Sequence, residues 1–416
     1  MGVVPGLPLS LLSLLISIIL VALLGVVVSK IHDNIYKTTL IVIVVLLMII
    51  TAWVCNSRSG MIASFSGGLF ILLLRKENSK KWLIWGVTLL VFAALLYFIR
   101  PESSRGRIFI WRVCLNMIKD NPKGLGINGM SNAYMLYQAD YFENNPDSLF
   151  IPNATDITIA YNEFFRIAVN FGIAGLILFL ALIANVLITK SDNGKNDLFK
   201  ALLISYLSFS LFSFPFANLY TWSLFPISLF ILKKKIFSKV INFICILCLI
   251  GGLLFFSEEH KLQKQIEYQY INGFDDEWLL SMLNCSNFFL FYPALTDMIL
   301  QCDSFQNNRF YEKFVDKAVL FMPSTDSYCR KAELLIRKNR HREAIPYLNK
   351  AQNMVPQKLR PRYMEFLIYY ENGDMPNAIR KGNEILSLDY KIESSNAILI
   401  LDDVKSKMAS IELLLN

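Results

Sequence analysis

The sequence predicts an all-α membrane protein, in which a polytopic bundle of about eight transmembrane helices precedes a C-terminal helical-repeat domain. Hydrophobic residues make up 54% of the 416 residues and charged residues only 18%, whereas a soluble domain carries about a quarter charged residues. The apolar residues lie in long runs before residue 257, and the chain beyond has the composition of a soluble protein. After residue 310 a helical pattern repeats itself.

The apolar runs define the expected spans, since about 17 to 25 apolar residues cross the hydrocarbon core as a helix. The run Gly60–Leu74 is short and borrows residues from the Cys55–Ser59 turn. The run Ala201–Leu232 is too long for one span and breaks at Phe214–Asn218, so we expect two helices joined by a tight turn. The candidate spans are Leu9–Val28, Thr38–Val54, Gly60–Leu74, Trp82–Ile99, Tyr161–Ile188, the two halves of Ala201–Leu232, and Val240–Phe256.

Basic residues predict the orientation of these spans. Four clusters fall on one side if there are eight spans, and a Lys/Arg excess marks the cytoplasmic face. The formal charge of +8 is therefore a topology signal, and we expect no nucleic-acid partner. The first run lacks a preceding basic segment, so we expect it to remain a span rather than a cleaved signal peptide. The clusters are Lys30 and Lys37; Arg75, Lys76, Lys80 and Lys81; Lys190, Lys195 and Lys200; and Lys233, Lys234, Lys235 and Lys239.

This topology divides the chain into four consecutive parts. N-terminal spans occupy residues 1–99, an extracytoplasmic loop 100–160, C-terminal spans 161–256, and an extracytoplasmic helical-repeat domain 257–416. The seven cysteines show no metal-ligand spacing, and we expect neither a metal site nor another cofactor.

The C-terminal part fits the frame of a tetratricopeptide repeat. One copy carries Tyr328, Ala332, Leu335, Ala344, Leu348, Ala351 and Pro356. The second follows 34 residues later, which is the period of this repeat, with Arg362, Phe366, Tyr369, Ala378, Gly382 and Ile385. A weaker copy precedes both, with Phe314, Ala318 and Pro323. Tetratricopeptide-repeat arrays bind peptides or proteins, so an envelope protein is an expected partner. The alternative to a repeat array is a non-repetitive helical bundle.

The loop of residues 100–160 is long enough to be functional rather than a connector. It opens with Ser103-Ser104-Arg105-Gly106-Arg107 and an amphipathic stretch, Ile108–Ile118, that contains Trp111. A turn-rich run, Asp120–Gly129, follows with Pro122, Gly124 and Gly126. The loop returns to the membrane through Tyr161-Asn162-Glu163.

Three blocks in this order resemble the O-antigen ligase and O-antigen polymerase family of bacterial envelope glycosyltransferases. The resemblance covers roughly residues 40–235. Family members usually carry more N-terminal spans, so the chain resembles a short or late-starting version, and a periplasmic helical-repeat tail also occurs in the family. The blocks are Ser57-Arg58-Ser59-Gly60; Gly106-Arg107 with Trp111, followed by Asp120-x-Pro122-x-Gly124-x-Gly126; and Asn162-Glu163, entering a span with Phe171-Gly172-Ile173-x-Gly175-Leu176.

The resemblance implies transfer of a glycan from a polyprenyl diphosphate to a hydroxyl of a lipid or glycan acceptor. The reaction takes place at the outer face of the bacterial inner membrane and without a metal. Cations aimed at the leaving diphosphate would stabilise its developing charge, and arginine binds phosphate oxygens in pairs. The expected topology places Arg58, Arg105 and Arg107 on one face of the membrane. They are the candidate diphosphate ligands, with Arg107 fitting the family frame better than Arg105.

Each of these residues also has a structural interpretation. Arg58 could be an interfacial anchor. Glu163 and Arg166 are spaced for an ion pair within one helix, which is as often structural as catalytic. The Asp120–Gly129 run could be a linker only, or its glycines could permit close approach to a sugar or phosphate.

The chain departs from the family where many ligases carry a histidine, at or just before the Asn162 position. Tyr161 precedes Asn162 here, and Asn170 stands where the family tends to have a glutamate. General-base work is left to Asp156, to Glu163, or to no side chain. These departures fit a polymerase or a divergent ligase better than a standard lipopolysaccharide ligase. The competing hypothesis is a non-catalytic membrane anchor that displays the repeat domain. A transporter is disfavoured, because the spans carry almost no ionisable residues away from their ends.

Overall fold

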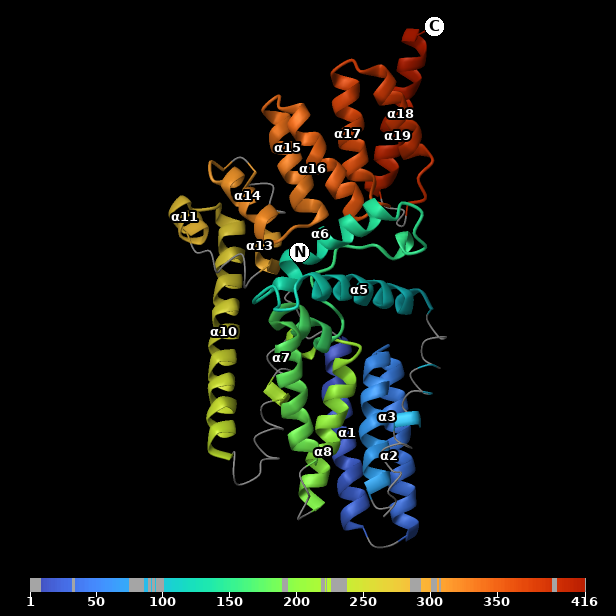
Figure 1. Cartoon of the computed structure of the whole chain (residues 1–416), viewed down its shortest axis with the longest axis vertical. Helices are drawn as coiled ribbons and strands as arrows, with labels where there is room; N and C mark the ends of the chain where they lie inside the picture. Colours follow the sequence, from blue (N-terminus) through green and yellow to red (C-terminus); the bar gives the residue numbers. More distant parts are fainter. Residues whose placement is uncertain are drawn as a thin grey trace. The chain divides into compact units, whose positions relative to one another are not determined.

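The computed structural model describes residues 9–31, 34–74, 86–88, 91, 94, 101–188, 194–217, 221, 223–225, 238–284, 293–300, 305–306, 308–390 and 395–415. Within these ranges every regular element is a helix (Figure 1), as the predicted fold class requires. The chain separates into two compact units. The first comprises residues 1–104 and 159–260, and the second comprises residues 105–158 and 261–416. The predicted loop and the predicted tail therefore belong to one unit.

Apolar helices dominate the first unit. They are α1 (Leu9–Lys30), α2 (Asn34–Val54), α3 (Arg58–Leu74), α7 (Glu163–Ile188), α8 (Gly194–Ser210), the 3₁₀ turn η2 (Pro215–Ala217) and the first part of α10 (Ser238–Asn272). Among the described residues, three segments are long and apolar enough to cross a membrane: Leu11–Lys30, Asn34–Thr51 and Glu163–Ile188. Arg58–Leu73 is apolar but shorter.

Several predicted boundaries differ from the observed helices. Helix α8 begins at Gly194, so Lys195 and Lys200 lie within a helix and not in a loop. Helix α10 continues past Phe256 to Asn272, because the polar residues beyond Phe256 include good helix formers such as glutamate, lysine and glutamine. The predicted span Trp82–Ile99 and the basic clusters at 75–81 and 233–235 lie largely outside the described residues, as does Lys190.

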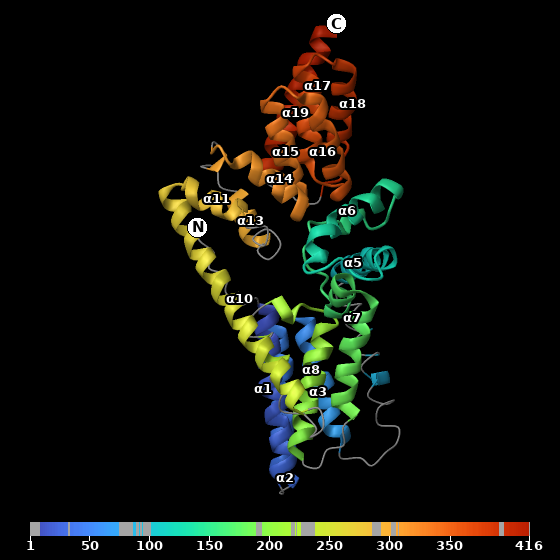
Figure 2. The same ribbon diagram turned by 60° about the vertical axis from the view of Figure 1, so that its left-hand side comes forward.

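Small and hydroxylated residues allow α1, α3 and α8 to pack closely, and both views show them side by side (Figures 1 and 2). A Cβ on Gly67 of α3 would lie 1.9 Å from Ser205 Oγ of α8 and 3.0 Å from the Ala201 carbonyl oxygen. Hydroxyl pairs join the same helices, with Ser66 Oγ 2.7 Å from Ser208 Oγ and Ser64 donating to Ser17 Oγ over 2.7 Å. These contacts satisfy polar groups without burying charge.

Helix α7 is bent at Gly172, where the sequence predicts one straight span. The glycine has φ 73° and ψ −176°, outside the helical region. A residue with a Cβ adopts this conformation rarely, so the glycine of the third sequence block has a backbone role at the bend.

Helices also fill most of the second unit, including the segment that the sequence predicts as a loop. Helix α5 (Pro101–Asp120) extends beyond the predicted amphipathic stretch, and α6 (Gly129–Asn144) was not predicted. The remaining elements are η1 (Ile151–Asn153), α11 (Asp276–Asn284), α13 (Pro293–Leu300), α14 (Tyr311–Phe321), α15 (Thr325–Arg337), α16 (His341–Met354), α17 (Leu359–Glu371), α18 (Met375–Leu386) and α19 (Ser395–Leu415).

The helices of the tail follow the predicted period. Helix α17 begins 34 residues after α15, and α18 begins 34 residues after α16. The small residues of the predicted frame are fully buried at the helix contacts: Ala332, Ala344, Ala351 and Ala378. Gly373, with φ 72°, forms the turn between α17 and α18. The spacing and the buried positions thus agree with the sequence pattern.

We predict that Gly67→Leu lowers the free energy of unfolding by about 1–3 kcal/mol or prevents folding, because the added side chain must displace α8. Gly251→Leu is the matched control, since no atom lies within 4 Å of the Cβ position at Gly251. Thermal unfolding of the detergent-solubilised protein measures the difference. Equal midpoints for the two variants would contradict the close packing.

Candidate functional site

The first sequence block forms the start of α3 in the first unit. Asn56, with φ 49°, makes the turn out of α2, and Ser57 Oγ accepts a hydrogen bond from the backbone N–H of Gly60 over 3.2 Å. Arg58 lies directly after this cap. Its Nη1 donates to Ser104 Oγ over 2.8 Å and its Nη2 donates to Ser103 Oγ over 2.7 Å. The first block therefore contacts the two serines that lie just before the second block.

The second block lies on α5. Arg105 is exposed, whereas Arg107 and Trp111 are half-buried. The apolar face of α5 packs against α6 and the segment after it, with the Phe109 ring 5.1 Å from that of Phe142 and 5.3 Å from that of Phe150. Arg105 and Arg107 thus extend from a helix that is anchored by its apolar face.

The turn-rich run joins α5 to α6. Gly124 and Gly126 both have positive φ, at 88° and 87°, and Asn128 has φ 62°. The Gly124 N–H donates to the Asn121 carbonyl and the Gly129 N–H donates to the Gly126 carbonyl. These turns account for both glycines of the Asp120-x-Pro122-x-Gly124-x-Gly126 pattern through backbone geometry.

The third block starts α7. Tyr161 has φ 51°, in the left-handed region, and its ring meets that of Phe214 edge-on at 5.3 Å. The Asn162 side chain is the helix cap, since its Oδ1 accepts from the backbone N–H of Phe164 at 2.9 Å and of Phe165 at 3.1 Å. The sequence did not indicate this capping role for Asn162.

Glu163 and Arg166 form the predicted ion pair. Arg166 Nε lies 2.6 Å from Glu163 Oε2, and the Glu163 side chain is only 1% exposed. The other oxygen, Oε1, accepts from the backbone N–H of Phe216 over 2.9 Å, and the Arg166 guanidinium lies over the Phe216 ring. The pair therefore joins the start of α7 to the Phe214–Phe216 turn, and both carboxylate oxygens are engaged.

Asp156 lies in the second unit and is also engaged. Its Oδ1 accepts from the Thr325 backbone N–H at 2.9 Å and from the Thr325 hydroxyl at 2.6 Å, and its Oδ2 lies 2.5 Å from Lys358 Nζ. Burial by itself would lower the pKa of Lys358, but the carboxylates of Asp156 and Asp326 raise it above its usual value. The lysine is therefore charged at neutral pH, and it loses its charge when the pH rises above that raised pKa.

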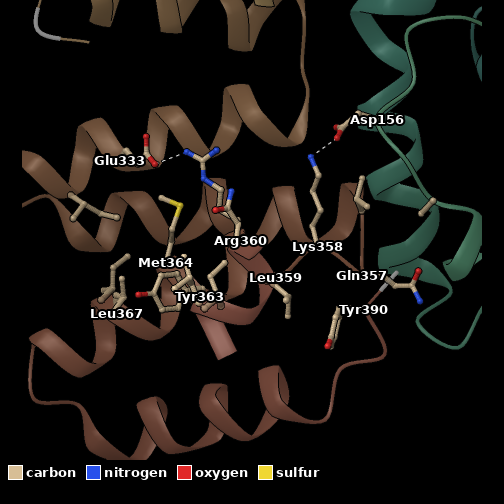
Figure 3. A pocket seen from close by; sticks show the side chains of 18 of the residues that line it. Asp156, Glu333, Gln357, Lys358, Leu359, Arg360, Tyr363, Met364, Leu367 and Tyr390 are labelled. Carbon is tan, nitrogen blue, oxygen red and sulfur yellow. Dashed lines mark hydrogen bonds and ion pairs between the residues drawn. The ribbon is translucent and has the colours of Figure 1, made fainter. Parts of the chain in front are cut away.

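A groove of about 930 Å³ begins at this pair and runs along the inner side of the tail helices (Figure 3). At its polar end Lys358 points to Asp156 and Arg360 to Glu333, over 2.6 Å for the second pair. Its floor is mostly apolar. Among the lining residues are Ile336, Val355, Leu359, Tyr363, Met364, Leu367, Ile368, Tyr390, Ala397, Leu399 and Ile400. Lys358 and Arg360 are each paired with an acidic residue of the groove lining, and the rest of the lining is chiefly apolar.

The three blocks lie within one segment that resembles a known family. Residues 43–180 match the family model described as O-antigen ligase. This match supports the O-antigen ligase family. No curated protein and no solved structure matches the chain. Together with the apolar helices, the match indicates a membrane protein with a glycosyltransferase-type function in envelope glycan assembly.

The sequence alone did not assign a role to some residues whose contacts the structure shows. Ser103 and Ser104 stand directly before Arg105, but their contact with Arg58 depends on the fold. Gln138 is fully buried on the apolar face of α6 and donates to the carbonyls of Thr155 and Met354 at 3.0 and 2.6 Å. The sequence signal that could have indicated Gln138 is an amide side chain among apolar residues at helical spacing. No sequence signal indicated the role of Lys358, since it lies 202 residues from its partner Asp156.

We predict that Glu163→Ala lowers the free energy of unfolding by about 2–3 kcal/mol, because the Phe216 N–H and the Arg166 guanidinium lose their acceptor. Glu163→Gln should lose less, since its amide oxygen still accepts one of these bonds. Thermal unfolding in detergent compares the two variants. If both midpoints equal that of the unchanged protein, the ion pair does not hold the turn.

Proposed function

We propose that the protein moves a glycan from a polyprenyl-diphosphate carrier to an acceptor hydroxyl, as an O-antigen ligase or polymerase. The proposal includes a site at the outer face of the bacterial inner membrane, with the 100–160 segment and the tetratricopeptide-like tail in the periplasm. It also includes metal-independent catalysis, in which arginines bind the diphosphate. The family match to residues 43–180 and the 34-residue helix spacing of the tail support these assignments.

The contact of Arg58 with Ser103 and Ser104 carries the proposal. Arg58 Nη1 and Nη2 both donate to serine hydroxyls, and these two bonds fix the orientation of the guanidinium. A guanidinium held in place needs little reorganisation when negative charge develops on a leaving diphosphate. Its paired N–H groups match the geometry of phosphate oxygens, and it stays charged when partly buried.

Arg107 and Arg105 would complete the diphosphate site. They lie on α5, only a few residues beyond Ser103 and Ser104, which bind Arg58. In this proposal Arg107 contacts the diphosphate, and the exposed Arg105 adds charge at the membrane interface. Trp111 lies one turn beyond Arg107 on the same helix.

The acceptor hydroxyl needs a route for its proton. Asp156 and Glu163 are the carboxylates that the sequence points to, but both are held in structural contacts by Lys358 and Thr325, and by Arg166 and Phe216. We therefore favour the third alternative from the sequence, in which no side chain acts as base. The acceptor hydroxyl then gives its proton to the leaving diphosphate as the new glycosidic bond forms and the bond to the carrier breaks, and stabilisation of the leaving diphosphate drives the transfer.

Arg58→Ala and Arg107→Ala are each expected to reduce glycan transfer about 100-fold or more, because each removes a cation from the developing diphosphate charge. Arg58→Lys should restore part of the activity, since a lysine keeps the charge but not the paired geometry. The measurement is the surface-glycan banding pattern of a deletion strain that carries each variant, with membrane insertion checked by immunoblot.

Arg342→Ala, at an exposed position of the tail, is the control and should leave the banding unchanged. Normal glycan in both Arg58→Ala and Arg107→Ala would reject the transferase function.

The banding pattern of the deletion strain also separates the ligase reaction from the polymerase reaction. Single units without long chains indicate a polymerase, and full-length but unattached polymer indicates a ligase.

The groove favours a second candidate function, a non-catalytic membrane anchor whose tail binds an envelope protein. Its apolar floor suits a polypeptide with apolar side chains. This function does not need the arginines, so the two candidates make opposite predictions for Arg58→Ala.

Under the scaffold function, Leu399→Asp is expected to abolish the deletion-strain complementation, since it places a charge on the groove floor. Leu399 is 66% exposed, so the change leaves the helix packing intact. Leu413→Asp is the matched control on the same helix, because Leu413 is 80% exposed and does not line the groove. Full complementation by Leu399→Asp, together with loss in Arg58→Ala, would exclude the scaffold in favour of the transferase.

A further inference from the structure

The segment before Tyr161 is bound to the helical tail through one side chain. Asp156 contacts two residues of the tail: the backbone N–H and hydroxyl of Thr325 at the start of α15, and the Lys358 ammonium just before α17. Thr325 is fully buried, whereas the Asp156 and Lys358 side chains are 31% and 35% exposed. Asp156 thus occupies a defined place between the two helix pairs of the tail. It stands five residues before Tyr161 in the sequence.

A second contact joins the tail to α6. The buried Gln138 amide donates to the carbonyl oxygen of Thr155 and to that of Met354 at the end of α16, so one side chain links three segments. Lys350 of α16 also forms an ion pair with Asp140 of α6. Helices α6 and α16 lie against each other along these contacts (Figure 1).

Helix α6 in turn holds α5, the helix that carries Arg105 and Arg107. Beside the ring contacts of Phe109, Cys114 Sγ lies 3.8 Å from Met130 Sδ, and both side chains are buried. Burial raises the pKa of the Cys114 thiol, so it is a neutral packing group. Side-chain contacts therefore continue from α16 through α6 to the arginine-bearing helix.

We infer that the helical tail is the scaffold that positions the arginines of α5 and the chain before Tyr161, with Gln138, Asp156 and Lys358 as positioning residues. The inference rests on the proposed transferase function and extends it. The tail is a working part of the enzyme and not an appended binding module. Loosening the Asp156–Lys358 contact misplaces the site without removing a group that binds the diphosphate.

Lys358→Met tests this role, because it removes the charge and keeps a stem of similar length. Asp156→Asn is the complementary variant, and Lys358→Arg is the conservative one. Lys338→Met is the matched control, since Lys338 Nζ lies 2.6 Å from Glu312 Oε2 in an exposed pair confined to the tail. Each purified full-length protein is assayed with membrane extract of the deletion strain, titrated as the source of lipid-linked glycan and acceptor. Hydrogen exchange is followed at residues 150–158.

In Lys358→Met and Asp156→Asn, kcat should fall about tenfold, because small displacements of positioned groups are costly. The KM for the lipid-linked glycan should stay within about twofold, since the diphosphate ligands remain. Exchange at residues 150–158 should become faster in both variants. Lys358→Arg should restore turnover and protection, and Lys338→Met should change neither.

The outcomes separate this inference from the proposed function. If the unchanged protein transfers glycan and Lys358→Met transfers it equally well, the positioning role is overturned and the transferase stands. A fall in kcat without faster exchange at residues 150–158 also overturns the positioning role. Absence of transfer by the unchanged protein overturns the proposed function, and this inference with it.

Discussion

The contact between Asp156 and Lys358 organises the second unit, because it joins parts of the chain that are 202 residues apart. Thr325 strengthens it by donating two hydrogen bonds to the same carboxylate. Such a partly exposed pair contributes little stability by its Coulomb energy alone. The contact instead restricts geometry. The Thr325 N–H, the Thr325 hydroxyl and the Lys358 ammonium all donate to the Asp156 carboxylate, and together they determine where the 154–158 segment lies. The buried Gln138 adds a similar constraint with no charge, so the predicted loop and the predicted tail form one unit.

Two arginines near the ends of apolar helices show how the partner determines what a cation can do. Arg166 is paired with the buried carboxylate of Glu163, and this pair joins α7 to the turn at Phe216. Arg58 is oriented by two serine hydroxyls, which accept hydrogen bonds from its Nη1 and Nη2. The same residue type therefore serves folding in one place and, in our proposal, diphosphate binding in the other.

The helical tail has two surfaces with different consequences for function. Its contact with α6 and the 154–158 segment makes it a structural support of the arginine-bearing helix. Its apolar groove offers a site for a polypeptide. The two surfaces share Asp156 and Lys358, because the pair closes the polar end of the groove.

Hydropathy and period determined the fold class, the apolar helices and the 34-residue spacing of the tail, because lipid and helix stacking impose simple linear patterns on a sequence. The order of the three blocks pointed to the family, and the spacing of Glu163 and Arg166 predicted their ion pair. Boundaries were less well predicted: α10 continues beyond its apolar part, and α5 and α6 occupy a segment that the sequence assigns to a loop. Helix-forming residues continue where the hydropathy falls, so hydropathy alone does not show where these helices begin or end.

Only the tertiary structure could assign the partners of the candidate site residues. The contacts of Arg58 with Ser103 and Ser104, of Asp156 with Lys358, and of Glu163 with Phe216 join positions 45 or more residues apart. No local spacing encodes such pairs, because they arise when independently formed helices pack. The sequence thus determined which groups are available for chemistry, and packing decided which of them are held in structural contacts.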